Sequence, residues 1–180
     1  MGIEIERKFL LLADDWRAAA DKVVPMTQGY LNDLAMVAGG AMNTSVRVRI
    51  EGEAARLNIK SRELGSTRQE FDYAIPLADA RALFALCVGG IIDKRRHLVE
   101  HAEHLWEIDE FLGDNAGLVV AEIELASADE AFGRPAWLDV EATHSQRYYN
   151  LALASRPFSQ WSEDERLAVD LKRSHLKDIN

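Results

Sequence analysis

The chain has 180 residues, which at roughly 150 residues per domain is the length of one domain with some decoration. Apolar residues make up 48% of it and charged residues 28%, and this composition excludes disordered, collagen-like and low-complexity proteins. The 30 acidic residues outnumber the 21 lysines and arginines, so the net charge of -9 argues against a protein that grips nucleic acid or an anionic membrane. An anionic ligand would require a local cluster of basic side chains.

The sequence carries no recognisable signal for export or membrane insertion. The N-terminal stretch has Glu4 and Glu6 where a signal peptide is basic and then apolar, and no run approaches the roughly 20 apolar residues of a membrane span. Cys87 is the single cysteine, so an internal disulfide cannot form. We therefore expect a cytoplasmic protein with no membrane partner and no nucleic-acid partner.

Apolar and charged residues alternate in segment after segment, which predicts β-strands. The alternating segments, together with two less regular stretches, fall at 3–9, 28–31, 46–50, 57–60, 70–75, 91–99, 106–109 and 121–125. They indicate about eight strands in a mainly β fold of the α+β class. Helices are expected at 14–23, 77–86, 127–132, 145–154 and 162–176, and a loop or hairpin tip at 34–42. No repeat or linker divides residues 1–180, which predicts a single domain.

The charged faces of these strands segregate by sign. One group of strands contributes Arg47, Arg49, Lys60, Lys94 and Arg96, and another contributes Glu4, Glu6, Glu107, Asp109, Glu122 and Glu124. For a single strand, a charged face in water is the commoner arrangement, but solubilising charges are normally mixed in sign. If the strands close into a barrel with their charged faces inward, the interior becomes a charged tunnel.

The charges of such an interior require partners of opposite charge, because an unpaired buried ion costs several kcal/mol. A polyanion and divalent cations would satisfy the two groups of charges. Carboxylates two residues apart on a strand, as in Glu4/Glu6 and Glu122/Glu124, point to the same side and can share Mg2+ or Mn2+. Lysine and arginine donate to phosphate oxygens, and strand parity favours Arg96 over Arg95 because Lys94 and Arg96 share a face.

Eight charged motifs follow one another along the chain. They are EIERK (4–8), QGYL (28–31), VRVR (46–49), LNIK (57–60), RQE (68–70), KRR (94–96), WEIDEF (106–111) and AEIEL (121–125). In this order they resemble the CYTH superfamily, the triphosphate tunnel metalloenzymes, and EIERK resembles its ExExK signature. The resemblance covers a tunnel core at about 2–153 and leaves a C-terminal helical extension at about 154–180.

The resemblance implies an eight-stranded antiparallel closed barrel with helices packed outside. Short bacterial members that begin with ExExK are most often inorganic triphosphatases. We therefore expect a metal-dependent phosphohydrolase that removes the terminal phosphate of a small-molecule triphosphate, with inorganic tripolyphosphate as the leading substrate. The open alternatives are a class IV-type adenylyl cyclase, a thiamine or nucleoside triphosphatase, and a non-catalytic polyphosphate-binding module. The final helix either plugs a tunnel mouth or contacts a second copy, so a homodimer also stays open.

The expected roles of the residues divide by charge. One or two Mg2+ or Mn2+ ions are expected on Glu4, Glu6, Glu122 and Glu124. The phosphates are expected to contact Lys8, Arg47, Arg49, Lys60, Lys94 and Arg96. By resemblance to some family triphosphatases, Lys94 and Tyr30 are expected as the catalytic pair that activates water. Supporting roles fall to Glu70, Glu107 and Asp109, the last two of which either ligate metal through water or orient basic neighbours.

Overall fold

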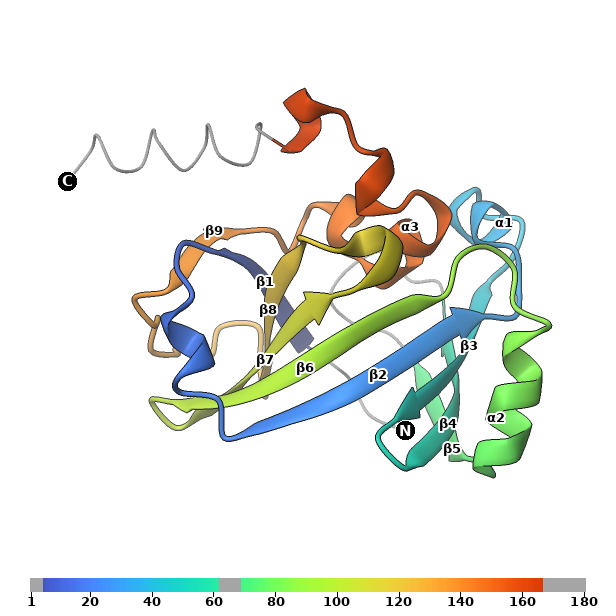
Figure 1. Ribbon diagram of the computed structural model, residues 1–180, viewed down its shortest axis with the longest axis horizontal. Helices are drawn as coiled ribbons and strands as arrows, with labels where there is room; N and C mark the ends of the chain where they lie inside the picture. The colour runs from blue at the N-terminus through green and yellow to red at the C-terminus, as the bar shows by residue number, and fades with distance from the viewer. Residues whose placement is uncertain (1–4, 62–68, 167–180) are drawn as a thin grey trace.

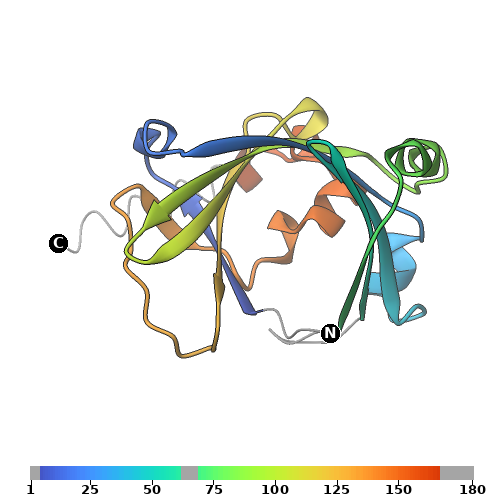
Figure 2. The same ribbon diagram turned by 90° about the horizontal axis from the view of Figure 1, so that it is seen from below.

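A computed structural model describes residues 5–61 and 69–166 of the chain. In this part, nine strands form one antiparallel sheet. They are β1 (Ile5–Leu11), β2 (Lys22–Tyr30), β3 (Thr44–Glu51), β4 (Ala54–Ser61), β5 (Glu70–Ala74), β6 (Ile92–His101), β7 (His104–Phe111), β8 (Val119–Leu125) and β9 (Leu138–Glu141). Their order is β5-β4-β3-β2-β6-β7-β8-β1-β9. The sheet curls so strongly that β4 and β5 stand across a hollow from β1 (Figures 1 and 2).

The prediction of a mainly β, antiparallel fold is confirmed. Two details differ from the expected eight-stranded closed barrel. The ninth strand, β9, was not among the predicted strands, although its four residues LDVE alternate apolar and acidic side chains. Strands β5 and β9 end the strand order, and no pairing between them closes the ring within residues 5–61 and 69–166.

The helices are short and lie around the sheet. They are α1 (Leu34–Ala38), α2 (Leu77–Phe84), α3 (Asn150–Ser155) and the single 3-10 turns η1 (Asp15–Arg17), η2 (Gly113–Asn115), η3 (Gln146–Tyr148) and η4 (Phe158–Gln160). The predicted helix at 77–86 corresponds to α2, and the one at 145–154 is divided into η3 and α3. The predicted helices at 14–23 and 127–132 are wrong, since the first contains only η1 before β2 begins and the second is irregular.

Two further expectations concern chain segments outside the sheet. The stretch 34–42 is not all loop, because α1 begins after Asp33, whose carboxylate accepts from the Ala35 N–H at 2.8 Å. The predicted start of the last helix is present as a capping box. The Glu165 N–H donates to Ser162 Oγ at 3.2 Å, and the Ser162 N–H donates to Glu165 Oε2 at 2.8 Å. The rest of that helix, to 176, lies outside the described residues.

The outer face of the curled sheet carries many of the apolar side chains that alternate with charged ones along the strands. Its larger cluster contains Phe9, Trp16, Val99, Trp106, Ile108, Ala121, Ile123, Leu125, Trp137 and Leu138. A smaller cluster joins Val48 and Ala55 to Ala80 of α2. Each large apolar side chain buried in this way contributes about 1.5–3 kcal/mol to folding. The outer layer therefore supplies much of the stability and leaves the inner face free for polar residues.

The inner face has an apolar zone and a charged zone. In the apolar zone, Leu10, Tyr30, Ile92, Phe111 and Val120 pack with residues of α3 and with Trp161. Helix α3 lies across this end of the hollow, as Figure 2 shows, so the expectation that the helices pack outside the sheet is wrong for α3. Because side chains two residues apart on a strand share a face, Lys8, Gln28, Lys94, Asp109 and Glu122 follow these apolar residues on the inner face. One end of the hollow is thus packed, and the remainder is polar.

Candidate functional site

The charged zone of the inner face surrounds a cavity with an empty volume of about 750 Å3, counted to its open mouth. It is lined by Glu6, Lys8, Gln28, Tyr30, Ser45, Arg47, Arg49, Asn58, Lys60, Lys94, Arg96, Glu107, Glu122, Tyr149, Asn150 and Leu151. All six residues expected to contact phosphate are in this set, although they come from four strands. Arg95 points to the other face and lies 3.4 Å from Glu110.

The acidic residues of the cavity come from three neighbouring strands, β7, β8 and β1. Glu107 pairs with Glu122 across β7 and β8, and Glu122 pairs with Lys8 across β8 and β1. Glu124 pairs with Glu6 but is exposed and does not line the cavity. Glu4, the fourth expected metal ligand, lies outside the described residues. The structure therefore brings Glu6, Glu107 and Glu122 to the cavity and leaves Glu124 at its margin.

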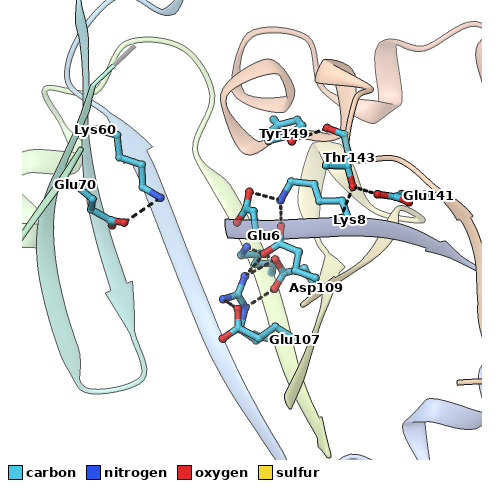
Figure 3. Close-up of polar contacts among 12 residues, drawn as sticks. Glu6, Lys8, Lys60, Glu70, Glu107, Asp109, Glu141, Thr143 and Tyr149 are labelled. Atoms are coloured by element: carbon cyan, nitrogen blue, oxygen red, sulfur yellow. Dashed lines mark hydrogen bonds and ion pairs between the residues drawn. The ribbon is translucent and has the colours of Figure 1, made fainter. Parts of the chain in front are cut away.

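The basic wall faces the acidic strands across the cavity and comes from β3 and β4. Arg47 and Arg49 lie on β3, and Lys60 lies on β4 beside Glu70 of β5, with 3.4 Å between Lys60 Nζ and Glu70 Oε2. Figure 3 shows Lys60 and Glu70 on one side and the cluster around Glu6 on the other. Glu70 thus lies beside Lys60 on the neighbouring strand, and its supporting role stays a prediction.

Arg47 and Arg49 are the least compensated cations of the basic wall. Their Nε atoms are buried, and no acceptor within the described part of the chain reaches them. Burial lowers the pKa of Arg49, and the positive charge of Arg47 lowers it further. Clustered cations with unfilled donors favour a polyanionic ligand, because its oxygens would accept from both guanidinium groups.

Lys94, Arg96 and Asp109 form a buried ion network beneath the cavity. Lys94 Nζ donates to Asp109, and Arg96 donates to both Asp109 oxygens at 2.7 and 2.8 Å. Burial alone would raise the pKa of Asp109, but the charges of Arg96 and Lys94 outweigh burial and lower it. Burial lowers the pKa of Lys94, and the attraction of Asp109 offsets this only in part. Asp109 therefore orients the two cations, one of which is shifted toward its neutral form.

Lys8 links two of the acidic strands. Its Nζ lies 3.1 Å from Glu6 Oε1 and donates to Glu122, which also accepts from Arg96 Nη2 at 3.0 Å. Burial would lower the pKa of Lys8, but the charges of Glu122 and Glu6 outweigh it and raise this pKa. The same ion pairs hold the pKa of Glu122 well below its usual range despite burial. Glu122 is therefore an ionised carboxylate inside the cavity.

The acidic wall fits a hard divalent cation in its chemistry. Glu6, Glu107 and Glu122 offer carboxylate oxygens, the donors that Mg2+ and Mn2+ prefer. In residues 5–61 and 69–166, no three such side chains form a ready cluster. Lys8 and Arg96 lie between the carboxylates and hold them in ion pairs. A bound metal would replace part of this pairing.

Tyr30 and Lys94 approach the cavity from the adjacent strands β2 and β6 and both line it. The Tyr30 hydroxyl lies 3.4 Å from Gln28 Nε2, and Tyr30 is only 5% exposed. Their role as a catalytic pair stays a prediction. What the structure adds is that both belong to one polar surface, at the border of the apolar zone.

Six lining residues were not predicted as functional from the sequence: Gln28, Ser45, Asn58, Tyr149, Asn150 and Leu151. Gln28 and Asn58 are each 1% exposed, and the Asn58 side-chain amide donates to Glu70. Gln28 and Asn58 lie two residues before Tyr30 and Lys60 and therefore share their strand faces. This spacing is the sequence pattern that could have identified them. Tyr149 lies between η3 and α3, where no periodic pattern marks it. Its contacts with Lys8 could be found only in three dimensions.

The curled antiparallel sheet thus surrounds a cavity that has an acidic wall and a basic wall. Residues 2–154 match the family model described as CYTH domain. The chain belongs to the CYTH domain family, and the relationship predicted from the eight motifs is confirmed. No helix in the described part of the chain is long and apolar enough to cross a membrane.

Two characterised relatives and one solved structure are similar to this chain over most of its length. The inorganic triphosphatase of Acetivibrio thermocellus is 37% identical over 164 residues, which are 91% of this chain and all of that protein. The inorganic triphosphatase of Nitrosomonas europaea is 34% identical over 155 residues, 84% of this chain and 96% of that protein. The crystal structure of the inorganic triphosphatase NE1496 has a TM-score of 0.61 at 31% identity and covers 86% of this chain and 95% of its own. The prediction that this chain is an enzyme of the hydrolase class is confirmed by these relatives.

Proposed function

We propose that this chain is a metal-dependent inorganic triphosphatase that removes a terminal phosphate from tripolyphosphate in the charged cavity. The observation that carries the proposal is the opposition of two walls. Lys60 lies on one side and Glu6 on the other, as Figure 3 shows. Arg47 and Arg49 are on β3, the strand next to that of Lys60, and Glu122 shares with Glu6 the ammonium of Lys8. A linear triphosphate is a compact polyanion that the first wall would bind, and a cation on the second wall would reach its oxygens. The names of the two relatives support the same substrate.

The basic residues bind and orient the triphosphate in this proposal. Arg47 and Arg49 have buried donors that phosphate oxygens would satisfy, and guanidinium groups bind phosphate in a fork geometry. Asp109 accepts two hydrogen bonds from Arg96 and fixes the orientation of its guanidinium group. The N–H groups of Arg96 that do not contact Asp109 therefore point in a fixed direction. Phosphoryl transfer depends mainly on positioning and charge stabilisation, which is the work that such a wall can perform.

Glu6 and Glu122 would hold the metal, with Glu107 and Glu124 beside them and Glu4 as a further expected ligand. A bound Mg2+ or Mn2+ would neutralise phosphate charge and lower the pKa of a coordinated water. The ionised state of Glu122 suits this role, because a metal ligand must be deprotonated. Glu107 is less suited to hold a metal, because its pKa is raised. Burial raises this pKa, and the charge of Arg96 offsets the effect only in part.

Lys94 and Tyr30 would orient the attacking water and take its proton. Lys94 has a pKa lowered by burial, which moves it toward the neutral amine that a base requires. Lys94→Ala and Tyr30→Phe are expected to lower kcat by about 100-fold or more with a smaller change in KM. An unchanged kcat in both variants would remove the pair from the mechanism and leave the rest of the proposal standing.

The deciding experiment measures phosphate release from tripolyphosphate, ATP and thiamine triphosphate, each with Mg2+, Mn2+ or EDTA. We expect release from tripolyphosphate that EDTA abolishes and that Glu122→Gln reduces by at least 100-fold. Glu110→Gln is the matched control, because Glu110 lies on the outer face of β7 and does not line the cavity. Cyclic AMP from ATP would move the assignment to a cyclase, and preferred release from an organic triphosphate would change the substrate. Binding of these compounds without turnover would leave a non-catalytic polyphosphate-binding module as the assigned function.

The cytoplasmic location and the homodimer are separate parts of the proposal. A lone cysteine, Cys87, supports a reducing compartment. Sedimentation of the purified chain over a range of concentrations tests the dimer, and a single monomeric species at all concentrations would remove it.

A further inference from the structure

Tyr149 supports Lys8 from the side of the cavity nearest α3. The Lys8 Nζ lies 4.7 Å from the centroid of the Tyr149 ring, within the range of a cation–π contact. Lys8 is 3% exposed, so water does not screen this contact. Both residues line the cavity. The ring therefore meets the ammonium on a surface that a ligand would also occupy.

Thr143 fixes both the Tyr149 ring and the Lys8 backbone. The Tyr149 hydroxyl donates to the Thr143 carbonyl oxygen at 2.7 Å, and the Lys8 N–H donates to Thr143 Oγ1 at 3.0 Å. The Ala142 N–H donates to the Lys8 carbonyl oxygen at 2.8 Å. Figure 3 shows Tyr149, Thr143 and Lys8 joined in this way. Lys8 is thus held at its backbone and at its ammonium by one short segment.

The segment that holds Lys8 is itself tied to the opposite face of β1. Thr143 Oγ1 donates to Glu141 Oε1 at 2.7 Å, and Arg7 Nε donates to the same oxygen at 2.9 Å. Arg7 precedes Lys8, so its side chain points away from the cavity. A continuous hydrogen-bonded path therefore runs from Arg7 outside to Tyr149 inside, and it limits how far the ring can move.

An aromatic ring differs from a third carboxylate in what it does to Lys8. Glu6 and Glu122 already contact the ammonium, and another negative charge would neutralise it further and repel a phosphate. The face of a ring attracts the ammonium through its quadrupole and carries no net charge. The contact therefore holds Lys8 in place without adding a third negative charge beside its ammonium.

We propose that Tyr149 is a positioning residue, whose ring directs the Lys8 ammonium toward the triphosphate, with Thr143 setting the orientation of the ring. The inference rests on the proposed function, because it takes tripolyphosphate as the ligand that Lys8 contacts. Tyr149 acts through Lys8 and touches no reacting atom in this account. The ring face carries the effect, and the hydroxyl contributes only through Thr143.

The test compares Tyr149→Leu with Tyr149→Phe by calorimetric titration of tripolyphosphate in EDTA. Losing the ring is expected to weaken binding by about tenfold, whereas Tyr149→Phe keeps the ring and stays within about threefold of the original. In turnover assays the Leu variant should raise KM more than it lowers kcat. Tyr73→Leu is the control, because Tyr73 lies exposed on the edge strand β5 and should leave binding unchanged.

A double-mutant cycle separates positioning from a general loss of structure. In a Lys8→Met background, Tyr149→Leu should cause no further loss of binding, since the group it positions is gone. If the Leu variant does not fold, Tyr149→Met fills the space without a ring and gives the same readout. Equal losses with and without Lys8, or binding unchanged in the Leu variant, would overturn the inference. Absence of both binding and turnover by the original chain, with Mg2+ as well as in EDTA, would instead overturn the proposed function.

Discussion

Arg96 donates to both oxygens of Asp109, from Nε to Oδ1 at 2.8 Å and from Nη2 to Oδ2 at 2.7 Å. This planar, two-point contact is buried, and Lys94 donates to the same carboxylate. A single carboxylate therefore fixes two of the cavity's cations. It also balances their charge in a place where water cannot.

Asp109→Asn is expected to destabilise the fold by about 3 kcal/mol or more, because it leaves two buried cations short of a counter-charge. The free energy of unfolding in urea measures the loss. Glu110→Gln, on the neighbouring outer position, removes the same charge from partly exposed pairs and should cost about 1 kcal/mol or less. Equal losses in the two variants would contradict the special role of Asp109.

Arg49→Met is expected to stabilise the empty protein and weaken ligand binding. Arg49 is a half-buried cation beside Arg47, and its buried Nε has no acceptor within the described residues. Glu51 lies 3.6 Å from its Nη2 and compensates it only in part, so removing Arg49 relieves repulsion and desolvation. We expect the free energy of unfolding to rise by about 0.5–2 kcal/mol and affinity for tripolyphosphate in EDTA to fall by about 10-fold or more. Arg95→Met removes a half-exposed cation that pairs with Glu110 on the outer face, and it should do neither. A loss of stability in Arg49→Met would contradict the argument.

Gly29→Ala is expected to destabilise β2 between Gln28 and Tyr30. A Cβ atom at Gly29 would lie 2.6 Å from Cys87 Sγ and 2.7 Å from Ile91 Cδ1, both closer than contact distance. Overpacking of this kind costs about 1–3 kcal/mol. Cys87→Ala should restore part of the loss, because it removes the nearer atom. Thermal unfolding of the two single variants and the double variant checks this, and additive losses would count against a direct clash.

Glu165 provides a pH-dependent contact at the start of the last helix. Hydrogen bonds from Arg156 and from the Ser162 N–H lower the pKa of Glu165 to about 2. The contact therefore stabilises the folded state above about pH 4.5, and the stabilisation is lost as the pH falls toward 2. Carboxyl NMR should give this low midpoint. In Arg156→Gln the pKa should rise but stay below its usual value, because the Ser162 N–H still donates; an unmoved midpoint would remove Arg156 as the main cause.

Alternation was enough to predict which residues share the inner face. Lys94 and Arg96 fall on one side of β6 and Arg95 on the other because successive side chains of a strand point to opposite faces. Alternation cannot predict which strand lies beside which. That Lys8 meets Glu122, and Arg96 meets Asp109, depends on β8 pairing with β1 and β6 with β7, which is a property of the whole sheet.

Helices were harder to predict than strands. The segment 14–23 has alanines that favour a helix, but Trp16 is buried against the ring of His97 and the chain is extended from Lys22 to pair with β6. Tertiary packing overrides local propensity in such a case. Tyr149 at the candidate site could not be predicted for a similar reason. Its proposed role depends on its contacts with Thr143 and with Lys8, and Lys8 lies on β1, at the other end of the sequence.

The apolar cluster on the inner face fills the end of the hollow beside α3. Leu10, Ile92 and Phe111 pack there with Leu153 and Trp161. If the proposed phosphate chain enters from the polar end, it leads with one terminus, and that terminus comes to lie nearest α3. Its two fragments would then leave in sequence, the one nearer the entry first.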